Sequence, residues 1–128
     1  MNRVKQEIVA SAVGRIKATQ SGTVNRRYRF SPDFIGFSGH FPGYPILPAF
    51  VQILTALTLA EEQRGHPLEL AGVENAKFHI QLRPGQEIKV ECKEKLVRGK
   101  PGCEARLMVA DGLASLFRMS FVEKGDAR

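Results

Sequence analysis

The sequence ILPAFVQILTALTLA, residues 46–60, decides the fold. Eleven of these fifteen residues are apolar, and three polar residues recur at a spacing of three: Gln52, Thr55 and Thr58. A helical segment that is apolar on nearly all sides predicts a buried helix. Pro48 suits the first turn, where a missing N–H leaves no bond unmade. The polar residues 61–64 extend the helix into solvent, and Gly65 can end it.

Strand patterns follow this helix to the end of the chain. Short apolar or alternating segments lie at residues 70–80, 87–97, 103–110 and 113–122. The pair Asp111-Gly112 between the last two segments is a strong signal for a hairpin turn. One long helix followed by an antiparallel meander predicts an α+β domain, with helices packed on one face of a sheet.

The N-terminal part of the chain predicts one more helix and one more strand. Asn2 can cap a helix over residues 3–13, with Val4, Ile8 and Ala12 on one face. Residues 22–30 alternate between two faces, as a half-exposed strand does. Residues 31–45 are punctuated by Gly and Pro and are expected to form a loop.

The length of 128 residues fits a single domain over residues 1–128. The composition, 43% hydrophobic and 25% charged, is that of a globular protein. The helical stretch 46–60 is shorter than the roughly 20 residues that span a bilayer, so we expect no membrane segment. Residues 1–14 lack the apolar block of a secretory signal, and we expect a cytoplasmic protein.

Positive charge is concentrated at the start of the chain. The net charge is +6, and residues 1–30 alone hold seven basic residues and one acidic residue. Such a surface attracts an acidic partner, which can be nucleic acid, anionic lipid or an acidic protein, or it is a solvated face. No aromatic platform, zinc finger or recognition-helix pattern accompanies the charge, so we expect no nucleic acid.

The chain has two cysteines, Cys92 and Cys103, which are expected to be reduced thiols in the cytoplasm. A turn over residues 99–102 places Cys103 opposite about Val97 and Cys92 opposite about Met108. In that register the two sulfur atoms do not meet. Two cysteines without CxxC spacing are a poor ligand set, so we expect no metal site.

The segment GHFPGYPILPA, residues 39–49, carries the chemistry. His40 lies in a proline-stiffened loop, eight residues before Pro48 and the free N–H groups of the helix start. Imidazole exchanges protons near neutral pH, and a helix start can hold a carbonyl oxygen that gains negative charge. The combination suits removal of a proton beside a carbonyl group. A structural hydrogen-bonding role for His40 is the alternative at this point.

The run GHFPGYPILPAFVQ resembles the signature of the 3-hydroxyacyl-acyl-carrier-protein dehydratases of bacterial fatty acid synthesis. Further similar segments are AGVENAKF (71–78), RPG (83–85) and the final pair of strands, so that the resemblance covers residues 22–123. It implies the hot-dog fold, in which a curved antiparallel sheet wraps a long central helix. It also implies a dimer with two active sites at the subunit interface.

The resemblance assigns roles to individual residues. It implies that His40 is the catalytic histidine and that the thioester carbonyl lies at the helix start. Most members have Gly where this chain has Ala49, a change that keeps the N–H. The substrate-binding residues that the resemblance implies are Phe41, Pro42, Gly43, Pro48, Ala49, Phe50 and Leu54.

Leu54 departs from the family pattern. Fourteen residues after the histidine, the family has a Glu or Asp that the other subunit supplies, whereas leucine holds no proton. Candidates for a different second acid/base group are Gln52, Glu61, Glu74 and Tyr44. Three functions stay open: a variant dehydratase, a protein that binds acyl-carrier thioesters without dehydrating them, and a hot-dog thioesterase. The retained His40 favours the dehydratase.

The same resemblance sets the expected partners. Dehydration uses no cofactor, because the phosphopantetheine arm arrives attached to the substrate's carrier. The sequence holds no phosphate loop or dinucleotide fingerprint. The expected partners are an acyl carrier protein and a second copy of the chain, in a homodimer that can associate further.

Overall fold

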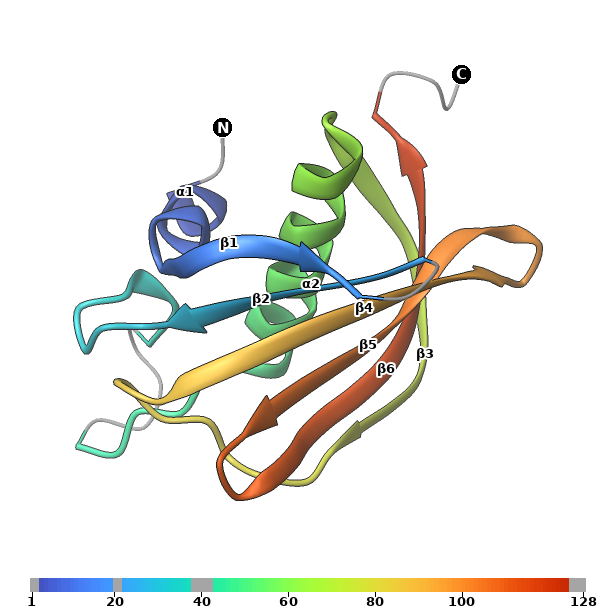
Figure 1. Ribbon diagram of the computed structural model, residues 1–128. Coiled ribbons are helices and arrows are strands. Elements are labelled where there is room, and N and C mark those ends of the chain that lie inside the picture. Colours follow the sequence, from blue (N-terminus) through green and yellow to red (C-terminus); the bar gives the residue numbers. More distant parts are fainter. Residues whose placement is uncertain (1–2, 20–21, 38–42, 125–128) are drawn as a thin grey trace.

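The computed structural model describes residues 3–19, 22–37 and 43–124, which form helices on one side of a six-stranded sheet (Figure 1). The elements are α1 (Arg3–Ala10), β1 (Ala12–Ala18), β2 (Thr23–Arg29), the 3-10 helix η1 (Ile35–Phe37), α2 (Ala49–Arg64), β3 (Leu68–Phe78), β4 (Glu87–Val97), β5 (Lys100–Val109) and β6 (Gly112–Glu123). The strand order is β1-β2-β4-β5-β6-β3, with every neighbouring pair antiparallel. No helix in the described ranges is both long and apolar enough to cross a membrane.

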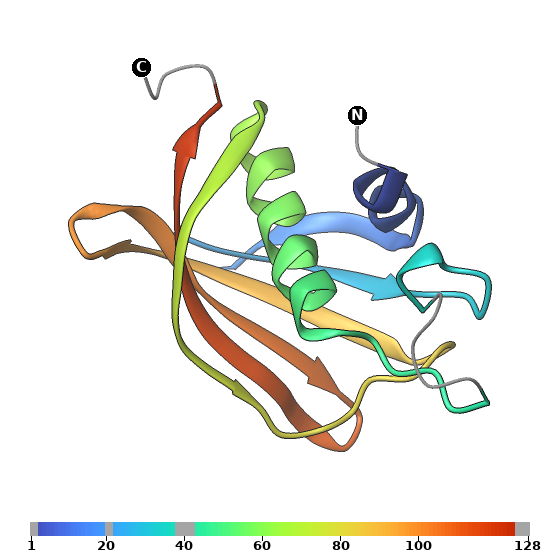
Figure 2. The same ribbon diagram turned by 180° about the vertical axis from the view of Figure 1, so that it is seen from behind.

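The helix α2 lies across the inner face of the curved sheet (Figure 2). The side chains packed between the two layers are fully shielded from water: Val51, Ala56 and Leu59 of α2, Val90 of β4, Leu107 of β5 and Phe117 of β6. Burial of this apolar surface is the main force that holds helix and sheet together. The α+β architecture expected from the sequence is confirmed.

The central helix starts later than predicted and ends as predicted. It begins at Ala49 rather than at residue 46, because the N–H of Leu47 donates to the carbonyl of Leu82 at 2.8 Å and keeps the preceding chain extended. Pro48 precedes the first turn, with φ −65° and ψ 155°. Gly65 ends the helix at φ 80°, where a side chain would be strained, as the sequence predicts.

The N-terminal segment differs from the prediction. The first helix ends at Ala10 rather than at residue 13, and β1 follows as an edge strand that the sequence pattern did not indicate. The N–H and hydroxyl of Ser11 bond back to the last turn of α1. Ser11 therefore ends α1. Gly14, at φ 79°, lies inside β1, between Val13 and Lys17, where the pairing with β2 is irregular.

The later strands agree with the prediction more closely. β4 has the predicted bounds, and β3, β5 and β6 differ by no more than three residues at either end. The hairpin between β5 and β6 pairs Val109 with Gly112, so it turns one residue earlier than predicted. The expected loop 31–45 contains η1.

The turn between β4 and β5 is tighter than expected. Val97 pairs with Lys100, which leaves only Arg98 and Gly99 in the turn. Both turn residues have positive φ, 52° and 77°. Such values are those of the two-residue turn whose twist matches that of the flanking strands.

This register corrects the expectation for the two cysteines. Cys103 faces Glu94, and Cys92 faces Ala105, so the cysteines are diagonal neighbours on one face of the sheet. Both are buried free thiols, and Cys103 contributes to raising the pKa of the Cys92 thiol. The predicted register is wrong, because it assumed a longer turn and placed the two cysteines farther apart along the strands.

Candidate active site

Two backbone N–H groups at the start of α2 are unsatisfied. The carbonyl of Pro48 accepts the N–H groups of Val51 and Gln52, both at 3.1 Å. The N–H groups of Ala49 and Phe50 have no acceptor within the described residues, and no side chain caps this end. Both residues are exposed, Phe50 to 53%. Within the described part of the chain, both donors are therefore available to a ligand.

The electrostatics of this helix end favour an anion. Aligned peptide dipoles leave a partial positive charge at a helix N-terminus. The first turn of α2 holds no acidic side chain that would neutralise this charge. Two N–H groups so placed can stabilise an oxygen that becomes negative during a reaction.

Several contacts hold the helix start in place. The N–H of Leu47 bonds to Leu82, and the side-chain Nε2 of Gln52 donates to the carbonyl of Leu47 at 3.1 Å. The guanidinium of Arg83, beside Leu82, lies 3.7 Å from the centre of the Tyr44 ring. Local sequence patterns do not predict this pair, because two residues 39 positions apart meet only through the fold.

The structure describes only some of the residues predicted for the site. His40, Phe41 and Pro42 lie outside the described residues, and their roles stay predictions. Those within the described residues are Gly43, Pro48, Ala49, Phe50 and Leu54. Gly43, at φ 82°, is exposed on the segment that leads into α2.

Leu54 lies one turn beyond Phe50 on the same helix. Its side chain is half-buried and packs against the core. Its carbonyl accepts the hydroxyl of Thr58 at 2.8 Å. The position that carries an acid in the resembled family is thus apolar and only partly covered.

Gln52 and Glu61 were candidates for the second acid/base group. Gln52 is buried, and its amide holds the helix start and has no proton that titrates in the physiological range. The Glu61 carboxylate lies 2.8 Å from Lys5 Nζ and accepts the N–H of Leu68 at 2.8 Å. It is twelve residues beyond Ala49, about 18 Å along the helix axis. Glu61 therefore joins α1 and β3 to α2, far from the helix start.

Glu74 and Tyr44 were the other two candidates. Glu74 is ion-paired with Arg98 of the β4–β5 turn, on β3. Tyr44 is 49% exposed, and its hydroxyl donates weakly to Gln81 Oε1 at 3.4 Å. Of these two, only Tyr44 is on the segment that approaches the helix start.

The basic residues of β2 are paired with acids. Arg26 is half-buried and bonds to Glu62 of α2 at 2.8 Å, so it supports the fold. Arg27 and Arg29 are more exposed, and each lies 3.2 Å from Glu87. Because two guanidinium groups share one carboxylate, this end of β2 keeps a net positive charge.

The order and packing of these elements define a hot-dog protein, with two N–H donors at the start of its central helix. A family model described as ApeI-like, ApeI dehydratase, matches residues 16–111, three quarters of the chain. The chain belongs to the ApeI-like dehydratase family. The resemblance seen in the histidine motif is thereby confirmed.

A curated relative is the 3-hydroxyacyl-[acyl-carrier-protein] dehydratase FabZ of Bacillus cereus (strain AH820). It is 36% identical in an alignment of 83 positions, which covers 59% of this chain and 58% of the relative. The chain thus spans less than two thirds of the length of the curated relatives that it matches.

Solved structures share the fold at low identity. The dehydratase heterocomplex ApeI:P from Xenorhabdus doucetiae superposes with a TM-score of 0.73 at 20% identity, over 88% of this chain and 96% of that one. A thioesterase superfamily protein gives a TM-score of 0.56 at 18% identity, over 84% and 54%. These likenesses confirm the hot-dog fold.

Proposed function

We propose that this protein removes water from a 3-hydroxyacyl thioester carried by an acyl carrier protein and forms the 2-enoyl thioester. The observation that supports this most is the pair of free N–H groups at Ala49 and Phe50. They directly follow the segment that contains His40. Membership of a dehydratase family and a FabZ relative whose name states this substrate class favour the same reaction.

In the proposed reaction, His40 takes a proton from carbon 2 of the substrate. The thioester oxygen gains negative charge and is stabilised by the N–H groups of Ala49 and Phe50. The electron pair of the broken C–H bond forms the double bond to carbon 3. The hydroxyl leaves carbon 3 as water after it receives a proton.

The proton for the departing hydroxyl has no carboxylate donor at position 54. Glu61 is held by Lys5 and Leu68, and the Gln52 amide is not an acid. In our proposal, the imidazolium formed on His40 returns the proton to the hydroxyl. One group then serves as base and as acid.

A second copy of the chain is the proposed structural partner. Within the described strands, β3 has a neighbour on one side only. It carries the exposed apolar side chains Leu70, Val73 and Phe78, 37–43% exposed. Unpaired edges and exposed apolar patches favour association with another chain. Measuring the mass of the purified protein in solution tests for this homodimer. The ApeI:P structure is a heterocomplex, so a monomer that pairs only with a different protein is the alternative result.

Leu54 favours a second candidate, a protein that binds carrier thioesters without dehydrating them. A half-buried leucine suits an acyl chain but supplies no proton. In this alternative the helix start would hold the thioester carbonyl, and no product would form.

Conversion of a carrier-bound 3-hydroxyacyl thioester, followed by the absorbance of the conjugated product, tests the proposal. We expect His40→Ala to lower the rate by about 10²- to 10⁴-fold. Ala49→Pro removes one N–H at a helix position that tolerates proline, and Pro48 already has the extended conformation that a following proline requires. We expect it to lower kcat by about 10²-fold, whereas Ala49→Gly keeps the N–H and the rate.

Two results would overturn the dehydratase. One is a wild-type protein that binds the carrier thioester but gives no product, with binding unchanged in His40→Ala. That result supports the binding protein. The other is release of free acid from the thioester, which supports a thioesterase.

A further inference from the structure

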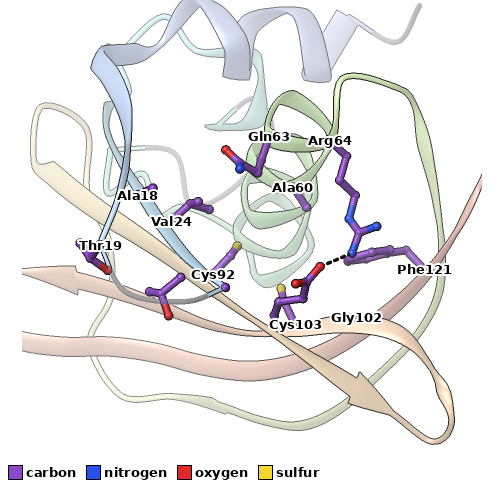
Figure 3. Close-up of a pocket in the computed structure, with 13 residues that line it drawn as sticks. Ala18, Thr19, Val24, Ala60, Gln63, Arg64, Cys92, Gly102, Cys103 and Phe121 are labelled. Carbon is purple, nitrogen blue, oxygen red and sulfur yellow. Dashed lines mark hydrogen bonds and ion pairs between the residues drawn. The ribbon is translucent and has the colours of Figure 1, made fainter.

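A cavity of about 330 Å³ opens at the end of α2 opposite to the candidate active site (Figure 3). It lies between the β1–β2 hairpin, the last turn of α2 and the strands β4, β5 and β6. Its apolar lining includes Val24, Ala60 and Phe121. The ion pair between Arg64 and Glu94, 2.8 Å long, also lines it. The proposed dehydration uses none of these residues.

Both cysteines of the chain line this cavity. Cys92 of β4 and Cys103 of β5 are diagonal neighbours on one face of the sheet. Figure 3 shows both sulfur atoms on the side of the strands that faces α2. The Cys92 thiol also donates to the carbonyl of Ala56 in α2, at 3.6 Å. The chain has no third cysteine, so these two are the pair that can form a disulfide within one chain.

We propose that Cys92 and Cys103 are a redox site, at which a small peroxide entering the cavity forms a reversible intramolecular disulfide. The cavity supplies the access that buried thiols otherwise lack. Hydrogen peroxide is smaller than the cavity by a wide margin, since a water molecule occupies about 30 Å³.

The reaction balances with peroxide as the only co-reactant. One sulfur, as the thiolate, attacks a peroxide oxygen and becomes a sulfenic acid, with release of hydroxide. The second sulfur attacks the first, the S–S bond forms, and the sulfenic oxygen leaves as hydroxide. With the two thiol protons, both hydroxides become water. Two thiols are oxidised and one peroxide is reduced.

The diagonal placement makes this disulfide easy to reduce. Diagonal neighbours in an antiparallel pair have Cα atoms about 7–8 Å apart. A disulfide usually has its Cα atoms no more than about 6.8 Å apart, so the backbones of β4 and β5 must shift relative to each other at this point. Cys92 must also leave the carbonyl of Ala56. Strained disulfides have high reduction potentials and belong to the labile, regulatory kind.

The environment of Cys92 also sets the rate. The hydrogen bond with Cys103 and burial raise the pKa of the Cys92 thiol well above its ordinary value. The thiolate is the reactive form. Oxidation is therefore slow compared with that of an exposed cysteine of low pKa, and it needs sustained exposure to peroxide.

The test treats the native protein with millimolar hydrogen peroxide and measures intact mass and free thiols. We expect a mass lower by two hydrogen atoms, a thiol count that falls from two to none, and no covalent dimer on a non-reducing gel. Reduced glutathione should restore both thiols. In Cys92→Ala and Cys103→Ala, the mass loss of two hydrogen atoms should disappear.

A second pair of variants tests the role of the cavity. Ala60→Leu fills it from α2, whereas Ala110→Leu makes the same change in the exposed turn between β5 and β6. We expect the first to slow disulfide formation severalfold and the second to leave its rate unchanged. The proposal is overturned if native protein keeps two thiols, gains oxygen atoms instead, or forms only disulfides between chains. Equal rates in the two leucine variants would overturn access through the cavity.

Discussion

The two ends of α2 are built in opposite ways. The C-terminal half is joined to three other elements by ion pairs, which are Lys5–Glu61, Arg26–Glu62 and Arg64–Glu94. Glu61 also accepts the N–H of Leu68, at the start of β3. The N-terminal end has no ion pair within the described residues and leaves two N–H groups free.

The difference separates stability from chemistry along one helix. Charged groups and hydrogen bonds fix the position of the C-terminal half, and those of Glu61 and Glu62 are partly shielded from solvent. A helix held firmly at one end can leave donors unsatisfied at the other, where a substrate oxygen can use them. Substitutions at the two ends are therefore expected to affect different measurements.

Leu54→Glu is expected to have the largest effect, at the N-terminal end. It places a carboxyl group where the resembled family has one. Burial raises the pKa of a carboxyl group, so it can act as an acid near neutral pH. We expect dehydration to rise by about 10²- to 10⁴-fold, with some loss of thermal stability.

Leu54→Gln is the matched control, since glutamine has nearly the same size as glutamate but no ionisable proton. The gain should be absent there, and it should be lost when His40→Ala is added to Leu54→Glu. A folded Leu54→Glu protein with no gain over an active wild type would make Leu54 an ordinary core residue.

Glu61→Gln is expected to have the largest effect at the C-terminal end. It removes the charge that faces Lys5 and weakens the acceptor for the N–H of Leu68. Denaturant unfolding should show a loss of about 2 kcal/mol, because hydrogen bonds to charged groups are the stronger ones. Turnover at saturating substrate should stay within about twofold of wild type.

The matched control is Glu94→Gln, which breaks an exposed pair with Arg64. Such pairs contribute about 0–1 kcal/mol. An equal loss of stability in both variants would mean that Glu61 anchors α2 no more strongly than an exposed ion pair does.

Gly65→Ala is expected to cost about 1 kcal/mol, since φ of 80° is unfavourable for a residue with a Cβ atom. A Cβ atom at this position would lie in open space, so a steric clash is excluded as the cause of the loss. Gly72→Ala is the control, because Gly72 does not have positive φ. Thermal or denaturant unfolding measures both, and catalysis should not change in either. If Gly65→Ala is as stable as the wild type, the positive φ at Gly65 does not disfavour a side chain at this helix end.

Arg27→Ser with Arg29→Ser is expected to have the smallest effect, about 1 kcal/mol in affinity for an acidic carrier. These residues carry the net positive charge beside Glu87. The loss should shrink as salt is raised, because salt screens exposed charges. Titration calorimetry with the carrier measures it.

Lys93→Ser with Lys100→Ser removes the same charge from a different part of the sheet. Equal losses in the two double variants would mean that carrier affinity follows total charge. If carrier affinity at low salt is unchanged in both double variants, the basic residues of β2 form a solvated surface with no role in carrier binding.

Local patterns predicted the helix α2, its end at Gly65 and most of the sheet. These features depend on residues close together in the sequence, such as the apolar run 46–60 and the alternation in β4. The start of α2 was not predicted, since the bond between Leu47 and Leu82 fixes it. The predicted register of the cysteines was wrong for a different reason: the length of one turn sets the pairing of every residue in the two strands that it joins.

The candidate site was predicted in outline only. The proline before an apolar helix indicated free N–H groups, and Ala49 and Phe50 have them. The engagement of Glu61 by Lys5 was not foreseeable, because the two residues are 56 positions apart and meet through packing of α1 on α2. A carboxylate on a helix gives no local sign that it is already bound.

The two-residue turn between β4 and β5 also bears on the order in which the chain folds. A tight hairpin forms within about 1–10 μs, because little chain entropy is lost in closing it. β3 precedes β4 in the sequence but pairs with β6, matching Leu68 with Glu123. Pairing across so long a separation is slow. The meander β4-β5-β6 is therefore expected to form first and β3 to dock last. An assembly that uses the free edge of β3 can form only after each chain has finished folding.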